Sequence, residues 1–110
     1  MAKDDYHVVV FRVLKYLYKQ LKEGQAPEPD MLRAGSKTFQ VNEMYWKYIL
    51  VSMQEDGLIR GLRKGKGEAG YERVEDQLKD LQIMPKGIEL LSDSRMGERV
   101  DQLIKGILKI

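Results

Sequence analysis

The sequence predicts an α+β fold with a three-helix core, a small antiparallel sheet and an extra amphipathic helix at the C-terminus. The first observation is a run of apolar and aromatic residues at helical spacing that ends at Gly57 and continues into a short strand and a glycine-rich basic turn. The second is the order of helix, short helix and turn before it, which begins a helix-turn-helix unit. Together they predict a winged helix-turn-helix domain over residues 1–94, followed by a helix over residues 95–110 for packing or dimerisation.

Residues 4–23 are expected to form the first helix, and Gly24 follows as its stop. Its basic residues lie opposite the apolar stripe, and we interpret them as a solvated face, with a phosphate-facing surface as the alternative. The stripe consists of Val10, Val13, Leu14, Leu17, Tyr18 and Leu21. The basic residues are Arg12, Lys15, Lys19 and Lys22.

Two prolines in the segment 25–29 predict a turn or an extended linker. A short helix is expected to begin at Pro29 and to end at Gly35. Residues 36–40 then form a tight connection into the central helix.

The central helix is predicted to begin with Asn42 or Thr38 as its N-terminal cap. One face supplies a core stripe at the spacing i, i+3, i+4, i+7, made of Trp46, Ile49, Leu50 and Met53. The opposite face is also apolar, which requires something to cover it, and presents Val41, Met44, Tyr45, Tyr48 and Val51.

This helix is an unusual base reader, because one lysine against three carboxylates leaves a net charge of −2 between Val41 and Asp56. Major-groove readers usually offer arginine, lysine, asparagine or glutamine to base edges. The polar side chains of this kind are Asn42, Lys47, Ser52 and Gln54.

Residues 58–63 are predicted to form a strand, 65–70 the tip of a hairpin and 71–75 the returning strand, followed by a polar turn. A third strand is expected at 81–83, and Pro85 opens a further helix. Four cations on the hairpin indicate either phosphate contacts or ion pairs with the acidic return strand. They are Arg60, Arg63, Lys64 and Lys66.

Three short motifs resemble the YjcQ-like winged-helix proteins of bacteria and their phages. They are LKEG at 21–24, QEDGLIRG at 54–61 and QIMPKGIELL at 82–91. The last resembles a strand-to-helix signature of the form I-T-x-K-G-x-x-Y-L, except that Met84 and Leu90 replace its threonine and tyrosine. The resemblance implies a phage-related winged helix and carries no catalytic residues.

Catalytic and metal-dependent functions have no residues to support them. The chain has no cysteine, and its single histidine, His7, has no partner for a metal site or a nucleophile. The acidic cluster from Glu72 to Asp80 lacks the spacing of a calcium loop. We therefore expect no enzyme activity, no cofactor and no small-molecule substrate. The absence of a long apolar run and of a signal-like N-terminus predicts a cytoplasmic protein without membrane contact.

Two functions remain open. The first, which the sequence favours, is nucleic-acid binding as a phage-type transcriptional regulator, with double-stranded DNA contacted by the four hairpin cations and by Lys47, Asn42 and Ser52. The second is a protein-interaction module or homodimer that buries the apolar face of the central helix and the C-terminal helix. Its interface would consist of Met44, Tyr45, Tyr48, Val51, Val100, Leu103, Ile104 and Ile107.

Overall fold

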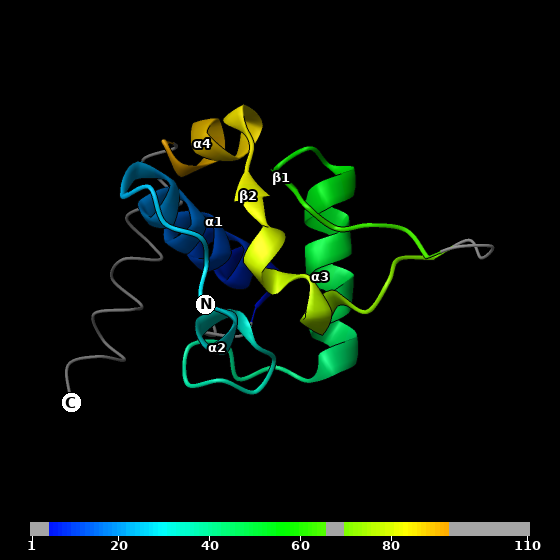
Figure 1. Ribbon diagram of the computed structural model, residues 1–110. Helices are drawn as coiled ribbons and strands as arrows, with labels where there is room; N and C mark the ends of the chain where they lie inside the picture. Colours follow the sequence, from blue (N-terminus) through cyan, green and yellow to red (C-terminus); the bar gives the residue numbers. More distant parts are fainter. Residues whose placement is uncertain (1–4, 66–69, 93–110) are drawn as a thin grey trace.

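The computed structural model describes residues 5–65 and 70–92 of the 110-residue chain. In this part the chain forms four α-helices, two 3₁₀ helices and a two-stranded antiparallel sheet, which confirms the predicted α+β class (Figure 1). The elements are α1 (Tyr6–Lys22), α2 (Pro29–Leu32), α3 (Glu43–Glu55), β1 (Ile59–Arg60), η1 (Val74–Asp76), η2 (Leu78–Asp80), β2 (Gln82–Ile83) and α4 (Pro85–Leu91). The helix predicted over 95–110 lies outside the described residues.

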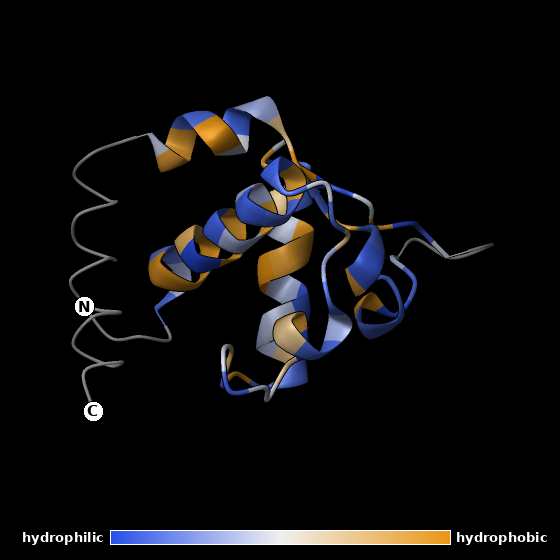
Figure 2. Ribbon diagram, turned by 60° about the vertical axis from the view of Figure 1, so that its left-hand side comes forward, coloured by the Kyte–Doolittle hydropathy of each residue, from blue (hydrophilic) through white to orange (hydrophobic). Residues whose placement is uncertain are grey.

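Helix α1 lies at the centre of this arrangement and packs against α3, β2 and α4. Hydrophobic residues recur along its length, interspersed with hydrophilic ones (Figure 2). Val10, Val13, Leu14 and Leu17 are buried as predicted. Leu21, by contrast, is 50% exposed, because it lies at the open hollow between the end of α1 and β2. None of the described helices is long and apolar enough to cross a membrane.

Arg12 does not belong to a solvated face. Its guanidinium lies over the ring of Phe39, 5.1 Å from the ring centroid, and donates a hydrogen bond to the carbonyl of Thr38. Burial lowers the pKa of this side chain. Arg12 therefore fixes the connection before α3 to α1 and is not a free phosphate contact.

The linker after α1 is held down by polar side chains of that helix. The Tyr16 hydroxyl accepts a hydrogen bond from the Glu28 N–H at 2.9 Å, and Gln20 donates to the Ala26 carbonyl at 3.0 Å. Helix α2 is a single turn that ends at Leu32, earlier than predicted. The connection that follows contributes Phe39 to the core, with its ring centroid 4.8 Å from that of Trp46.

The predicted caps and core stripe of α3 are confirmed. Asn42 Oδ1 accepts a hydrogen bond from the Tyr45 N–H at 2.8 Å, which satisfies one of the free donors at the helix start. Gly57, with φ +79°, follows the helix end in the left-handed conformation. The buried face consists of Trp46, Ile49, Leu50 and Met53.

The sheet differs from the predicted one, because β1 pairs with β2 and not with residues 71–75. Ile59 lies opposite Ile83 and Arg60 opposite Gln82. The strand stops at Gly61, which has φ +121° and approaches η2 so closely that a Cβ atom there would lie 2.2 Å from the Asp80 carbonyl oxygen. The expected strand over 58–63 is therefore only two residues long.

The predicted return strand is also corrected. The hairpin exists, because Gly65 donates to the Gly70 carbonyl at 2.7 Å and Glu72 to the Arg63 carbonyl at 2.8 Å. Only an isolated bridge between Lys64 and Tyr71 forms there, and the chain then enters η1 and η2. The polar turn expected at 76–80 lies within η1 and η2, and its residues Gln77 and Leu78 are buried.

Candidate interaction surface on the third helix

The basic hairpin leaves the body of the domain beside α3 (Figure 1). Arg60 and Lys64 are exposed: Arg60 Nε donates to Gln82 Oε1 at 2.9 Å, and the Lys64 ammonium lies 5.9 Å from the centroid of the Tyr71 ring. Lys66 lies outside the described residues. Arg60 and Lys64, two of the four predicted phosphate contacts, thus form no ion pair with a carboxylate in the described part of the chain.

Arg63 forms ion pairs instead. Its Nε lies 3.4 Å from Glu72 Oε2 and its Nη1 lies 3.1 Å from Asp80 Oδ2. The hydrogen bond that Arg63 donates to the Asp80 carboxylate is the main cause that raises the pKa of Arg63. The carboxylates of Glu72 and Asp80 therefore balance the positive charge of Arg63. For this residue the structure shows ion pairs with the acidic segment, which was the alternative to phosphate contacts.

Of the polar side chains predicted to contact bases from α3, those other than Lys47 have neighbours in the fold. Asn42 caps the helix, and Ser52 lies beside Tyr6. Gln54 donates to the Leu62 carbonyl at 2.9 Å and accepts from the Leu62 N–H at 2.7 Å. Lys47 is exposed, and in the described part of the chain it forms no ion pair. Of the polar side chains expected to read bases, only Lys47 is left without a structural task.

The outer face of α3 is defined by Met44, Tyr45, Tyr48 and Val51, and Val41, predicted for the same face, lies just before the N-terminal cap of the helix. Val41, Tyr45 and Val51 are half-buried against the edge of the core. Met44 and Tyr48 are 84% and 64% exposed. The interface residues predicted in the C-terminal helix, Val100, Leu103, Ile104 and Ile107, lie outside the described residues. Helix α3 thus exposes two large apolar side chains, Met44 in its first turn and Tyr48 near its middle.

A pocket of about 440 Å³ opens at the C-terminal half of this face. We call it the tyrosine pocket. The rings of Tyr6 and Tyr48 meet edge to face in it, with centroids 6.3 Å apart. Its lining residues are Tyr6 from α1 and Tyr45, Tyr48, Ser52, Glu55 and Asp56 from α3 and its C-terminal cap.

Burial first, and then the negative charge of Asp56, raise the pKa of Tyr6. The carboxylate is therefore close enough to the ring for its field to act on the phenol. Tyr6, Glu55 and Asp56 were not predicted as site residues. The two acids were visible as unfavourable charges for DNA, but the position of Tyr6 depends on how α1 crosses α3.

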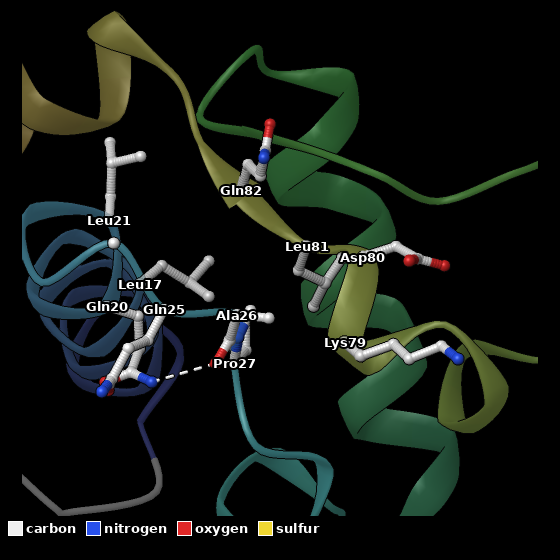
Figure 3. A pocket seen from close by; sticks show the side chains of 11 residues that line it. Leu17, Gln20, Leu21, Gln25, Ala26, Pro27, Lys79, Asp80, Leu81 and Gln82 are labelled. Atoms are coloured by element: carbon white, nitrogen blue, oxygen red, sulfur yellow. Dashed lines mark hydrogen bonds between the residues drawn. The ribbon is translucent and has the colours of Figure 1, made fainter.

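A second hollow, of about 380 Å³, lies between the end of α1, the linker and η2 (Figure 3). Leu17 and Leu21 line one side, and Lys79 and Asp80 lie on the other. Gln20 and Ala26 also line this hollow, and the Gln20 side chain donates a hydrogen bond to the Ala26 carbonyl, so this carbonyl already has a partner. This hollow contains no convergent set of charged groups, so the tyrosine pocket is the better candidate site.

The described residues define a small α+β domain with an apolar, acidic surface on α3. Among them, no group of histidine, cysteine, aspartate or glutamate side chains is arranged to hold a metal ion. The chain belongs to the YjcQ family, because the family model described as YjcQ protein matches residues 11–110. Searches of curated proteins and of solved structures gave no match.

Proposed function

We propose that this chain is a non-catalytic winged-helix domain that binds another protein through the outer face of α3. The observation that carries the proposal is the exposure of Met44 and Tyr48 on a helix whose opposite face is completely buried. Exposed apolar side chains that cluster within an otherwise polar surface are typical of protein-interaction sites. The order of helices and the basic hairpin support the winged-helix interpretation.

The charge of α3 favours a basic partner over a second copy of the chain. Glu43, Glu55 and Asp56 are exposed around the outer face, and Lys47 is an exposed cation on the same helix. Glu43 forms an ion pair with Arg73 at 3.8 Å, so Glu55 and Asp56 are the carboxylates of this surface that have no ion pair in the described part of the chain. Two identical faces would bring like charges together, which opposes association. A positively charged segment of another protein would instead find complementary charge around an apolar centre.

Selection of peptides from a random displayed library against the folded protein tests this proposal. We expect basic peptides whose binding weakens at least about tenfold in Met44→Ala and Tyr48→Ala, as for central interface residues. Both side chains are exposed, so the substitutions remove contact surface without opening a core cavity. Met31→Ala and Leu21→Ala are matched controls, because these residues are also exposed and apolar but lie away from α3.

Two outcomes contradict the proposal. In the first, the selected peptides bind Met44→Ala and Tyr48→Ala as tightly as the wild type. In the second, light scattering shows a wild-type dimer that these two substitutions convert to monomers, so that a second copy occupies the face.

Nucleic-acid binding by the hairpin is a second candidate function. It is favoured by Arg60 and Lys64, which are exposed and pair with no carboxylate in the described part of the chain. The phage-type regulator that the family resemblance suggests would use these cations for phosphate contacts. Sequence-specific contacts from α3 to base edges are less well supported, because Asn42 and Gln54 bond to the backbone and Ser52 lies beside Tyr6.

Fluorescence anisotropy with random duplex DNA at low salt tests this second function. If the hairpin contacts phosphates, Arg60→Glu with Lys64→Glu weakens binding and makes the dependence of log K on log salt less steep by about 0.9 per lost contact. Lys37→Glu, a charge reversal at an exposed lysine in the connection before α3, is the control. Unchanged affinity in the hairpin variant excludes this role for the hairpin.

A further inference from the structure

The tyrosine pocket has the composition of a site for a positively charged group. Tyr6 comes from the start of α1, and Tyr45 and Tyr48 come from α3, about two to three turns of helix before the two carboxylates. The faces of aromatic rings carry negative partial charge and attract ammonium and guanidinium groups. Rings contributed by two different helices can line a pocket from more than one side, as a flat row of exposed rings cannot.

Glu55 and Asp56 add full negative charges to the same pocket. Both are exposed, and neither forms an ion pair with a basic side chain in the described part of the chain. Asp56 lines the same pocket as Tyr6, and its negative charge contributes, after burial, to the raised pKa of that phenol. Lys86 is the cation to consider as a competitor, since a Cβ atom at Gly57 would lie 3.8 Å from its side chain. It does not line the pocket.

We propose that the tyrosine pocket binds the cationic head of an arginine or lysine side chain from a partner protein. This inference rests on the proposed function and identifies the anchor that the partner inserts. The rings of Tyr6, Tyr45 and Tyr48 surround the cation, and Glu55 and Asp56 balance its charge. The exposed Met44 and Tyr48 supply the neighbouring apolar surface for the residues that flank the anchor. Anionic groups such as phosphates are disfavoured at this pocket by the two carboxylates.

The test uses blocked amino acids whose charge differs and whose shape does not. Nα-acetyl-arginine methylamide is titrated into the full chain, and the aromatic side-chain resonances of the tyrosines are followed by NMR. Nα-acetyl-citrulline methylamide serves as the neutral isostere. We expect saturable shifts at Tyr6, Tyr45 and Tyr48 with the arginine compound, with a Kd on the order of millimolar. The citrulline compound should bind at least about fivefold more weakly.

Substitutions divide the site into its two components. Tyr48→Leu keeps an apolar side chain but removes the ring, and should weaken binding of the arginine compound about two- to fivefold. Glu55→Gln with Asp56→Asn should weaken it at least about threefold and reduce its salt dependence. Glu23→Gln with Glu89→Gln is the matched control. It removes two exposed carboxylates, one of them also at a helix C-terminal cap.

Equal affinity for the arginine and citrulline compounds overturns the inference, as does unchanged affinity in Glu55→Gln with Asp56→Asn. Failure of the inference can be told from failure of the proposed function. If selected peptides require Met44 and Tyr48 but bind equally well when their basic residues are replaced by citrulline, only the cation pocket is wrong. If the arginine compound binds the pocket but selected peptides do not depend on Met44, the proposed function is wrong and the pocket remains.

Discussion

At the scale of single residues, two glutamines hold the base of the hairpin. Gln77 is fully buried; its Oε1 accepts from the Arg63 N–H at 2.6 Å, and its Nε2 donates to the carbonyl of Glu72 at 3.1 Å. Gln54 binds both backbone groups of Leu62 from α3. The hydrogen bonds from these two side chains replace the backbone hydrogen bonds of the strand pair that the sequence predicted. The chain after the hairpin then forms η1 and η2, whose Val74 and Leu78 are buried in the core.

Truncation of Gln77 tests this account. We expect Gln77→Ala to lower the free energy of unfolding by about 1–3 kcal/mol, because it removes a fully buried side chain and leaves the part-buried Arg63 N–H without its partner. Urea denaturation followed by Trp46 fluorescence measures the change. Gln82→Ala, which removes an exposed glutamine, should stay within about 0.5 kcal/mol of the wild type. An equally small effect of Gln77→Ala would show that its hydrogen bonds do not hold the hairpin.

The titration of Tyr6 gives a second prediction at this scale. Burial and the charge of Asp56 raise its pKa above the ordinary value of 10.0. Since the folded state holds this proton more tightly than the unfolded state, the contribution to stability is complete below about pH 10 and is lost as pH rises through the folded pKa. Absorbance at 295 nm, as a difference between wild type and Tyr6→Phe, measures this titration.

The variant Asp56→Asn checks the cause of the shift. Removal of the charge should lower the pKa of Tyr6 toward its ordinary value, while the part due to burial remains. Glu23→Asn, at the cap of α1, is the control. A Tyr6 pKa that is the same with and without Asp56 would show that the carboxylate does not act on the tyrosine pocket.

At the scale of elements, the local patterns in the sequence were sufficient for α3 and insufficient for the sheet. The cap at Asn42, the core stripe and the stop at Gly57 follow from residue types at fixed spacing. The pairing of β1 with β2 depends on contacts between distant segments, in particular the approach of Gly61 to Asp80. Likewise, nothing in the local pattern around Tyr6 indicates that its ring meets Tyr48.

Helix α4 contains a glycine, Gly87, whose position leaves no room for a side chain. Gly87 is buried where α4 meets Leu58, just before β1: a Cβ atom there would lie 2.6 Å from the Leu58 carbonyl oxygen and 2.9 Å from both Ile83 Cγ1 and Leu14 Cδ2. Leu14 belongs to α1 and Ile83 to β2, so α4 packs closely against both elements at Gly87. Helix α4 begins without a side-chain cap from Met84, as the loss of the family threonine predicted.

Gly87→Ala should therefore destabilise the domain, although alanine is the better helix former. We expect a net loss of about 2 kcal/mol from overpacking, after the roughly 1 kcal/mol that alanine returns in helix propensity. Thermal unfolding measures the change. Gly70→Ala is the control, since a Cβ atom at Gly70 meets nothing within 4 Å. A Gly87→Ala protein as stable as the wild type would show that α4 does not need this close approach.

At the scale of the whole molecule, the exposed cations of the hairpin and the apolar, acidic face of α3 form two separate surfaces. The hairpin carries the exposed cations Arg60 and Lys64, and α3 carries the apolar outer face with its acidic surroundings. The sequence predicted both surfaces but favoured the hairpin as the functional one. The structure changes this balance, because it ties Arg63, Asn42 and Gln54 into the fold while Met44 and Tyr48 stay exposed.

The central claim is that the outer face of α3 is the binding surface. The most direct measurement is backbone amide chemical-shift mapping of the isotope-labelled chain with a peptide obtained from the library selection. The account predicts perturbations that cluster on Met44, Tyr45, Tyr48 and Val51 and extend to Tyr6. Perturbations confined to the hairpin residues Arg60 to Gly65, with none on α3, would contradict it.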